Sequence, residues 1–191
     1  MLFTKFFLPE NRAGRVERPR LFSRLEQAEG CSLFIAAAPA GFGKTTLVSA
    51  WVRARQIPAA WVSLDESDND PTRFWACLLT ALDQIFPEID RNSRALLVGG
   101  QPLSSQALLT TLLNDLALQP PPAPGAQPAC LVLDDIHRVT HPAIFEGLLF
   151  LVERLPASLR LILIGRSDPP LPLGWLRASR RLLELRAADL R

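Results

Sequence analysis

The chain has 191 residues, of which 48% are hydrophobic and 21% charged, and its formal net charge is +2. This length is typical of one domain that buries most of its apolar surface, and the composition excludes a disordered chain. A net charge this small gives no general attraction for nucleic acid. No apolar run reaches the ~20 residues of a membrane-spanning helix, and the N-terminus lacks the apolar core of a signal peptide. We therefore expect a cytoplasmic protein that does not contact a membrane.

The three cysteines, Cys31, Cys77 and Cys130, are widely spaced and form no C-x-x-C pair. Two of them, Cys31 and Cys130, lie in or beside apolar runs that are typical of strands. Because free cysteines are among the most often buried side chains, we expect small core residues in a reducing compartment.

The first half of the chain alternates strand-like and helix-like segments. A continuous apolar run at 32–38 predicts a buried strand, and the spacing of apolar residues over 43–55 predicts a helix. A second strand is predicted at 59–64. The next helix is expected to begin after Asp70, a suitable N-cap, with Pro71 at its first position.

The second half continues the alternation. A helix over 104–118 is expected to begin at Ser104 or Ser105. The segment 119–128 predicts an extended surface loop, because its prolines fix φ and lack an N–H group. The remaining predicted elements are strands at 129–135, 159–165 and 181–186, a helix at 141–155 and a proline-rich loop at 166–174.

Buried apolar strands separated by helices are typical of a parallel sheet with helices on both faces. The alternation therefore predicts an α/β fold, a three-layer α/β/α sandwich with a mainly parallel five-stranded sheet. No internal repeat is visible in the sequence.

The segment APAGFGKTT, residues 38–46, joins the first strand to the helix that follows it. It matches the phosphate-loop pattern G-x-x-x-x-G-K-[ST] except at the first position, where Ala38 replaces glycine. In such a loop, backbone N–H groups and a helix N-terminus converge on phosphate oxygens. Lys44 then reaches the β- and γ-phosphates, and the Thr45 hydroxyl binds Mg²⁺. The alternative is a glycine-rich turn that binds nothing, which the strand before the loop and the helix after it disfavour.

Ala38 is explained by its neighbour Pro39. A residue before proline adopts extended backbone with negative φ, which alanine accepts without strain. Gly41 and Gly43 remain in the part of the loop where the backbone approaches the phosphates and positive φ is needed. The predicted nucleotide-binding residues of the loop are Ala40, Gly41, Phe42, Gly43, Lys44, Thr45 and Thr46.

Two adjacent aspartates, Asp134 and Asp135, follow the apolar part of the strand predicted at 129–135. A phosphate loop needs a carboxylate for the magnesium shell, usually at the end of a neighbouring strand. We predict that Asp134 contacts Mg²⁺ through water and that Asp135 orients or deprotonates an attacking water molecule. Paired aspartates also form turns and caps, so this prediction depends on the loop upstream.

Arg166 follows the strand predicted at 159–165, at the same edge of the sheet as the phosphate loop. An arginine there can bind the γ-phosphate, and a surface ion pair is the alternative. His137 can sense the same region or serve as a structural histidine. His141 is assigned to a helix start.

Four segments, APAGFGKTTL, WVSLDESDNDPTRF, LVLDDIHRV and LILIGRSDPPLPLGWLR, together resemble the N-terminal ATPase module of regulators of the maltose-regulon activator type. These regulators are signal-transducing ATPases of the STAND class, joined to a LuxR-type DNA-binding domain. The likeness covers nearly the whole chain. It implies a switch that binds ATP or ADP with Mg²⁺, hydrolyses ATP slowly and self-associates within the parent protein.

The resemblance also implies a division of the chain into an adenine-proximal segment at 1–30 and a P-loop NTPase domain at 31–191. Asp65 and Arg73 match family positions to which the sequence assigns no role. By resemblance, Val16, Arg20 and Leu21 contact the nucleotide, Lys44 and Thr45 bind phosphate and magnesium, Asp134 and Asp135 form the acidic pair, and Arg166 senses the γ-phosphate and is catalytic together with Asp135.

Family members continue into an arm, a helical-repeat sensor and a helix-turn-helix domain, whereas this sequence stops at LRAADLR, about where the arm would begin. We therefore expect a module whose parent contacts DNA through a C-terminal domain. Two other functions stay open. One is a small P-loop kinase acting on a metabolite, which needs a lid and an acceptor site. The other is a DNA-binding module, which the low net charge and the lack of a helix-turn-helix disfavour.

Overall fold

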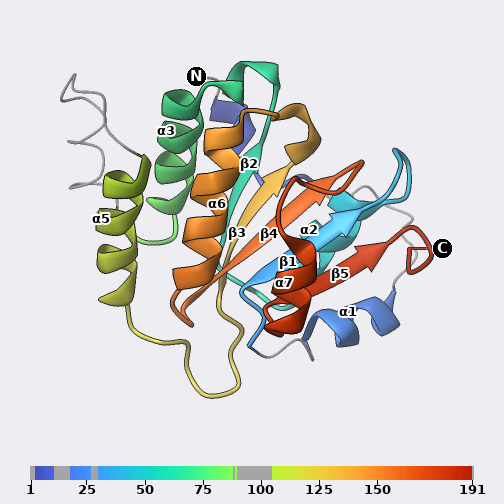
Figure 1. The fold of residues 1–191 in the computed structure, drawn as a ribbon. Coiled ribbons are helices and arrows are strands. Elements are labelled where there is room, and N and C mark those ends of the chain that lie inside the picture. The colour runs from blue at the N-terminus through green and yellow to red at the C-terminus, as the bar shows by residue number, and fades with distance from the viewer. Residues whose placement is uncertain (1–2, 11–17, 27–29, 88, 90–104, 191) are drawn as a thin grey trace.

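The computed structural model describes residues 3–10, 18–26, 30–87, 89 and 105–190. In this part of the chain, parallel strands form a five-stranded sheet in the order β2-β3-β4-β1-β5 (Figure 1). The sheet confirms the expected α/β class, and every expected strand is present within one residue of its expected bounds. The strands are β1 (Leu33–Ala37), β2 (Ala59–Ser63), β3 (Ala129–Asp134), β4 (Leu159–Gly165) and β5 (Leu182–Arg186).

Strand side chains alternate between two apolar clusters, one on each face of the sheet. In β1, Leu33 and Ile35 belong to one cluster, and Phe34 and Ala36 belong to the other. The strands β1, β3 and β4 are buried along their whole length. This is why they read as continuous apolar runs rather than as alternating patterns in the sequence.

Helices cover both faces of the sheet, which confirms the expected three-layer α/β/α sandwich (Figure 1). Buried side chains of α1 and α2 belong to one apolar cluster, and those of α3, α5, α6 and α7 belong to the other. None of the described helices is long and apolar enough to cross a membrane. The α-helices are α1 (Pro19–Glu26), α2 (Lys44–Ala54), α3 (Pro71–Leu82), α5 (Ser105–Ala117), α6 (Pro142–Arg154) and α7 (Leu173–Ala178), and short 3-10 helices are η1 (Phe3–Phe6), η2 (Glu66–Asn69) and η3 (Ile136–Arg138).

Two helix starts follow the sequence prediction closely. Asp70 caps α3, because its carboxylate accepts the backbone N–H of Arg73, and Pro71 occupies the first helical position. His141 caps α6 through its ring nitrogen Nδ1, which accepts the backbone N–H of the second helical residue. Proline suits the first turn of a helix because the N–H that it lacks would have no partner there. The cap considered at Ser104 lies outside the described residues.

The sequence does not predict α1 and α7. Each of these short helices has two buried apolar side chains, Leu21 and Leu25 in α1 and Leu173 and Leu176 in α7. A pattern of two residues is too short to distinguish a helix from a loop. The proline-rich loop expected at 166–174 therefore ends earlier, where α7 begins. The loop expected at 119–128 contains no helix or strand, as predicted.

The strands β1, β3 and β4 end at the same edge of the sheet. Ala37 of β1 pairs with Gly165 of β4, and Asp134 of β3 pairs with Ile164 of β4. The loops that follow these strands therefore leave the sheet close together. In open parallel sheets, ligands bind in the crevice outside the carboxyl ends of the strands, so the fold places the candidate site at this edge.

Gly147 lies where α6 packs closely against α3. A Cβ atom added at Gly147 would lie 2.4 Å from Cζ2 of Trp75, a residue that is 2% exposed. We predict that Gly147→Ala lowers the free energy of unfolding by about 1–3 kcal/mol, because overpacking outweighs the better helix propensity of alanine.

Gly174→Ala on α7 is the matched control for this prediction. A Cβ atom added at Gly174 would meet no atom within 4 Å. This variant is expected to be as stable as the wild type or more stable by up to ~1 kcal/mol, because alanine favours the helix. Urea denaturation measures both effects, and unchanged stability of Gly147→Ala would contradict the packing argument.

Candidate functional site

The loop between β1 and α2 has the backbone conformation that a phosphate loop requires. Gly41 and Gly43 have φ angles of 84° and 76°, in the left-handed region that favours glycine. Ala38 is not among the described residues with positive φ, and its N–H donates to the carbonyl oxygen of Gly165 at 3.3 Å. The structure therefore confirms that glycine is needed late in this loop and not at its first position.

The N-terminus of α2 offers its backbone N–H groups to a ligand. Gly43 precedes the helix and provides no side-chain cap. Uncapped N–H groups and the positive end of the helix dipole attract anions. Ala40 and Thr46 are exposed beside these groups, whereas Phe42 packs partly into the apolar cluster beneath the loop.

Lys44 folds back onto the loop itself. Its Nζ donates to the carbonyl oxygens of Ala38 at 2.7 Å and Pro39 at 2.9 Å, and the residue is 9% exposed. Burial lowers the pKa of Lys44, against the opposing effect of the nearby carboxylates of Asp134 and Asp135. A phosphate that binds Lys44 would therefore replace carbonyl oxygens as the partner of the ammonium group.

Asp134 lies at the end of β3 and contacts the first turn of α2. Its Oδ1 accepts the Thr45 hydroxyl at 3.2 Å and the backbone N–H of Asp135 at 3.0 Å. The sequence predicts the acidic pair on a strand that neighbours the one before the phosphate loop. In the sheet, β4 lies between that strand, β1, and the strand of the acidic pair, β3. Asp134 is 6% exposed, and burial, with the adjacent charge of Asp135, raises its pKa to about 6.

Asp135 has a φ angle of 58° and a ψ angle of 34°, in the left-handed region. Non-glycine residues are uncommon in this region, and aspartate accepts it better than most because its short side chain can form local hydrogen bonds. Its side chain is 47% exposed, with Oδ1 lying 3.8 Å from Nδ1 of His137 and Oδ2 lying 3.9 Å from Nε of Arg138. The carboxylate of the candidate catalytic base is therefore accessible from solvent.

His137 lies beside Asp135, with 3.8 Å between its Nδ1 atom and Oδ1 of Asp135. Its Nδ1 atom is buried and has no hydrogen-bond partner in the described part of the chain. Burial is the main reason why the pKa of His137 is lowered. Both interpretations of His137, a sensor of this region and a structural histidine, stay predictions.

Arg166 follows β4, the strand between β1 and β3. Burial lowers the pKa of Lys44 and of His137, and the charge of Arg166 adds to both shifts. Its place directly after β4 puts Arg166 at the same edge of the sheet as the phosphate loop and the acidic pair. Before it, Gly165 lets η3 approach β4, because a Cβ atom there would lie 3.1 Å from Cγ2 of Ile136.

The N-terminal residues assigned to the nucleotide are less closely tied to this edge. Val16 lies outside the described residues. Arg20 is exposed, and its guanidinium donates to the carbonyl oxygen of Asp189 at 2.9 Å. Leu21 is 2% exposed and belongs to the apolar cluster that contains Ala38 and residues of α2. Their contact with a nucleotide stays a prediction.

The structure gives roles to Asp65 and Arg73 that the sequence leaves open. Asp65 caps η2 and lies 2.8 Å from Nζ of Lys5, which is the main reason why the pKa of Asp65 is lowered. Arg73 lies 3.4 Å from Asp68, whose side chain is fully buried and 2.5 Å from Lys5. An aspartate pair spaced by three residues before a helix signals a capping box. Its ionic partner near the N-terminus has no sequence signal.

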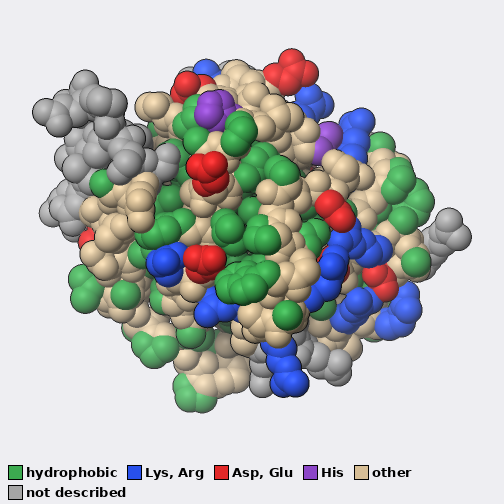
Figure 2. Space-filling model, in the orientation of Figure 1, with side chains coloured by type: hydrophobic (Ala, Val, Ile, Leu, Met, Phe, Trp, Pro, Cys, Tyr) green, Lys and Arg blue, Asp and Glu red, His purple; other side chains and the backbone are tan. Residues whose placement is uncertain are grey.

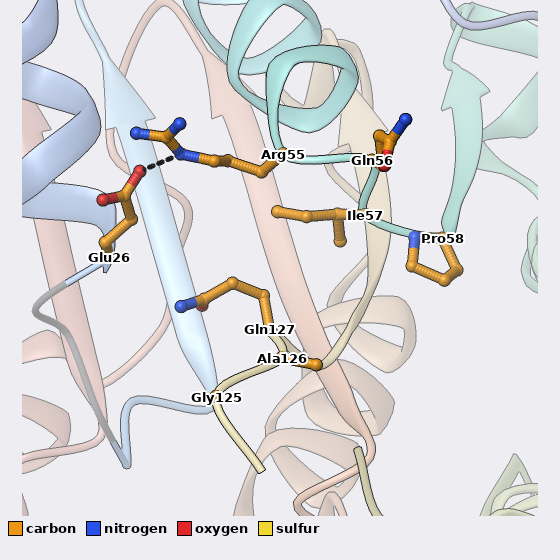
Figure 3. A pocket seen from close by; sticks show the side chains of 8 residues that line it. All are labelled: Glu26, Arg55, Gln56, Ile57, Pro58, Gly125, Ala126 and Gln127. Atoms are coloured by element: carbon orange, nitrogen blue, oxygen red, sulfur yellow. Dashed lines mark hydrogen bonds and ion pairs between the residues drawn. The ribbon is translucent and has the colours of Figure 1, made fainter. Parts of the chain in front are cut away.

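A cavity of ≈ 320 Å³ lies at the opposite edge of the sheet, where β2 and β3 begin (Figure 3). Glu26, Arg55, Ile57 and Gln127 are among the residues that line it, and the first two form an ion pair with an N–O distance of 2.5 Å. Because the phosphate loop lies at the carboxyl edge, this cavity is separate from the candidate site.

Charged side chains gather over β5 and α7 in Figure 2. Glu184 of β5 pairs with Arg177 of α7 and with Arg186, and Arg186 also pairs with Asp168. The hydrogen bond from Arg177 is the main reason why the pKa of Glu184 is lowered to about 2, and the contact with Arg186 adds to this shift. Arg181 donates to the carbonyl oxygens of Val152 and Glu153. Several arginines of the basic C-terminal stretch therefore have partners within the chain.

Comparison with known proteins agrees with this geometry. Residues 26–169 match the family described as AAA domain. The chain belongs to this family. It is 35% identical over 175 residues to the HTH-type transcriptional regulator MalT of Cronobacter sakazakii, and 36% identical over 187 residues to that of Serratia proteamaculans. These alignments cover 92% and 98% of this chain but only 19% and 20% of the relatives.

Solved structures show the same fold. A STAND protein with a tetratricopeptide repeat sensor from Pyrococcus horikoshii has a TM-score of 0.61 at 18% identity, covering 93% of this chain and 24% of that chain. A chain of Drosophila ORC bound to DNA has a TM-score of 0.51 at 13% identity, covering 88% of this chain and 86% of that chain. The comparisons confirm the resemblance to the ATPase module of MalT-type regulators and the P-loop fold.

The raised pKa of Asp134 predicts a pH dependence of stability in the nucleotide-free chain. The pKa of about 6 in the folded state, against 3.8 for the ordinary side chain, means that the folded state binds more protons between these values. The contribution of Asp134 to the free energy of unfolding therefore falls as pH rises from 4 to 7. Asparagine keeps the Oδ1 acceptor without the charge, so we predict that Asp134→Asn gains on the order of 3 kcal/mol relative to wild type between pH 4 and pH 8.

Urea denaturation of both chains in the presence of EDTA measures this difference. Parallel stability profiles for Asp134→Asn and wild type across this pH range would contradict the prediction. A constant offset between the profiles would report only a change in packing or hydrogen bonding.

Proposed function

We propose that this chain is the ATP-binding switch module of a cytoplasmic transcriptional regulator. In this proposal it binds ATP or ADP with Mg²⁺ and hydrolyses ATP slowly. The observation that carries the proposal is the convergence of Lys44, Thr45 and Asp134 at one edge of the sheet, beside an uncapped helix N-terminus. The similarity to MalT regulators supports the regulatory context.

The loop residues from Ala40 to Thr46 would hold the phosphates through backbone N–H groups, with Lys44 on the β- and γ-phosphates. Thr45 and Asp134 would hold Mg²⁺, directly and through water. Among the described residues, no group of three or more His, Cys, Asp or Glu side chains could hold a metal ion. This fits Mg²⁺, which takes few protein ligands and completes its shell with phosphate oxygens and water.

Asp135 would orient or deprotonate the attacking water, because its carboxylate is exposed while that of Asp134 is bonded to Thr45. Arg166 would bind the γ-phosphate, since its position after β4 lies between the phosphate loop and the acidic pair. The bound magnesium ion would supply charge neutralisation for the phosphates.

The N-terminal segment 1–30 would lie next to the adenine, with contacts from Val16, Arg20 and Leu21. The chain spans about a fifth of the length of the MalT relatives. Self-association and DNA binding through a C-terminal domain are therefore proposals about a parent protein. Different affinities of two conformations for ATP and ADP would drive the switch.

No observation favours the alternative of a small P-loop kinase. A lid needs arginines that are available to close over phosphates, but Arg177, Arg181 and Arg186 contact Glu184 or backbone carbonyls. The cavity at the amino edge lies away from the phosphate loop. ADP formation that depends on an added small-molecule acceptor would revive this alternative.

We predict that Lys44→Ala raises the dissociation constants for Mg·ATP and Mg·ADP about tenfold or more and abolishes phosphate release. The reason is the loss of the only side-chain cation within the loop. Isothermal titration calorimetry and a phosphate-release assay measure the two effects.

Arg55→Ala is the matched control, because Arg55 ends the same helix at the opposite edge of the sheet. This variant removes one positive charge and should leave nucleotide affinity unchanged. Equal affinity and equal phosphate release for Lys44→Ala and wild type would refute the proposed function.

A further inference from the structure

The loop from Asp65 to Asp70 lies between the N-terminal helix η1 and the Asp135 loop, which comprises residues 135–141 between β3 and α6. Lys5 of η1 contacts it at one end through Asp65 and Asp68. Asn69 contacts the Asp135 loop at the other end. The proposed phosphate chemistry assigns no role to the residues of this loop, although the loop contacts the segment that carries Asp135.

Asn69 makes three hydrogen bonds to the end of the Asp135 loop. Its Oδ1 accepts the backbone N–H groups of Thr140 and His141, both at 2.8 Å. Its Nδ2 donates to the Thr140 hydroxyl at 3.1 Å. Because these three bonds engage both ends of the amide, Asn69 holds the point where the Asp135 loop joins α6.

The end of the loop near Lys5 is held firmly. Asp68 is fully buried and accepts the backbone N–H of Asp65 at 2.8 Å in addition to its ion pair with Lys5. Removing one member of a buried ion pair is strongly unfavourable. Asn69 therefore projects from a rigid support rather than from a loose loop.

The Asp135 loop is enclosed on its other side by β4. Gly165 of β4 leaves room for Ile136 of η3, with 3.1 Å between the position of an added Cβ and Cγ2 of Ile136. At its start, Asp135 has left-handed backbone, which is uncommon outside glycine. At the opposite end of the loop, Asn69 binds the backbone N–H groups of Thr140 and His141.

We propose that Asn69 is a positioning residue for Asp135. By holding the backbone at Thr140 and His141, it fixes the path of the loop and thus the place of the Asp135 carboxylate at the carboxyl edge of the sheet. The inference rests on the proposed function, in which Asp135 acts on the attacking water. Asn69 itself touches neither nucleotide nor water in this role.

The test compares Asn69→Leu, which loses all three hydrogen bonds, with Asn69→Asp, which keeps the Oδ1 acceptor. Thr140→Val removes only the hydroxyl that accepts from Nδ2. Single-turnover hydrolysis of Mg·ATP and calorimetric affinity for Mg·ADP are measured for each purified variant of the 191-residue chain. Asn69→Leu is expected to slow hydrolysis about tenfold to a hundredfold with affinity changed less than about threefold.

Asn69→Asp and Thr140→Val are expected to retain hydrolysis within about threefold of wild type, because both keep the acceptor for the two backbone N–H groups. Amide hydrogen exchange at Thr140 and His141 should be slow in wild type and Asn69→Asp and fast in Asn69→Leu. Rescue by aspartate together with unchanged affinity would separate positioning from a general effect on folding.

Two results would overturn the inference. In one, Asn69→Leu hydrolyses ATP at the wild-type rate. In the other, it loses nucleotide affinity and hydrolysis together, which would assign Asn69 to the fold alone. A wild-type chain that neither binds nor hydrolyses ATP would instead refute the proposed function, and the positioning role with it. Wild-type hydrolysis with an unaffected Asn69→Leu variant refutes only the role of Asn69.

Discussion

The hydrogen bond between Thr45 and Asp134 connects two parts of the site that are 89 residues apart in the chain. It spans the end of β4, so it forms only if β1, β4 and β3 end at the same level. The parallel register of the sheet provides this alignment, and buried apolar side chains on both faces provide the register. The chemistry at the edge thus depends on packing deep in the sheet.

The site brings buried groups of opposite charge together without their usual solvation. Burial raises the pKa of Asp134 and lowers that of Lys44, so each charged form is disfavoured by its surroundings. Lys44 donates to backbone carbonyl oxygens, and Asp134 accepts from a hydroxyl and an N–H group. A metal-bound polyphosphate would provide stronger partners for both groups.

Local patterns determine what the sequence alone can predict here. The strands and the loop around Lys44 are recognisable because continuous apolar runs and glycine spacing are local signals. The short helix α7 is missed because only Leu173 and Leu176 are buried in it. The restraint by Asn69 is missed because its partners lie 71 and 72 residues away and are backbone groups, which have no identity in the sequence. Contacts of this kind become visible only in three dimensions.

The charged network on β5 also affects how the sheet can meet other chains. Arg24 donates to the carbonyl oxygen of Glu184, and Asp189 accepts the N–H of Arg186, so part of the outer backbone of β5 already has partners. At the other end of the sheet, η1 contacts β2. Exposed strand edges invite pairing with strands of other molecules, and charged side chains oppose it. These contacts oppose growth of the molecule into a continuous intermolecular sheet.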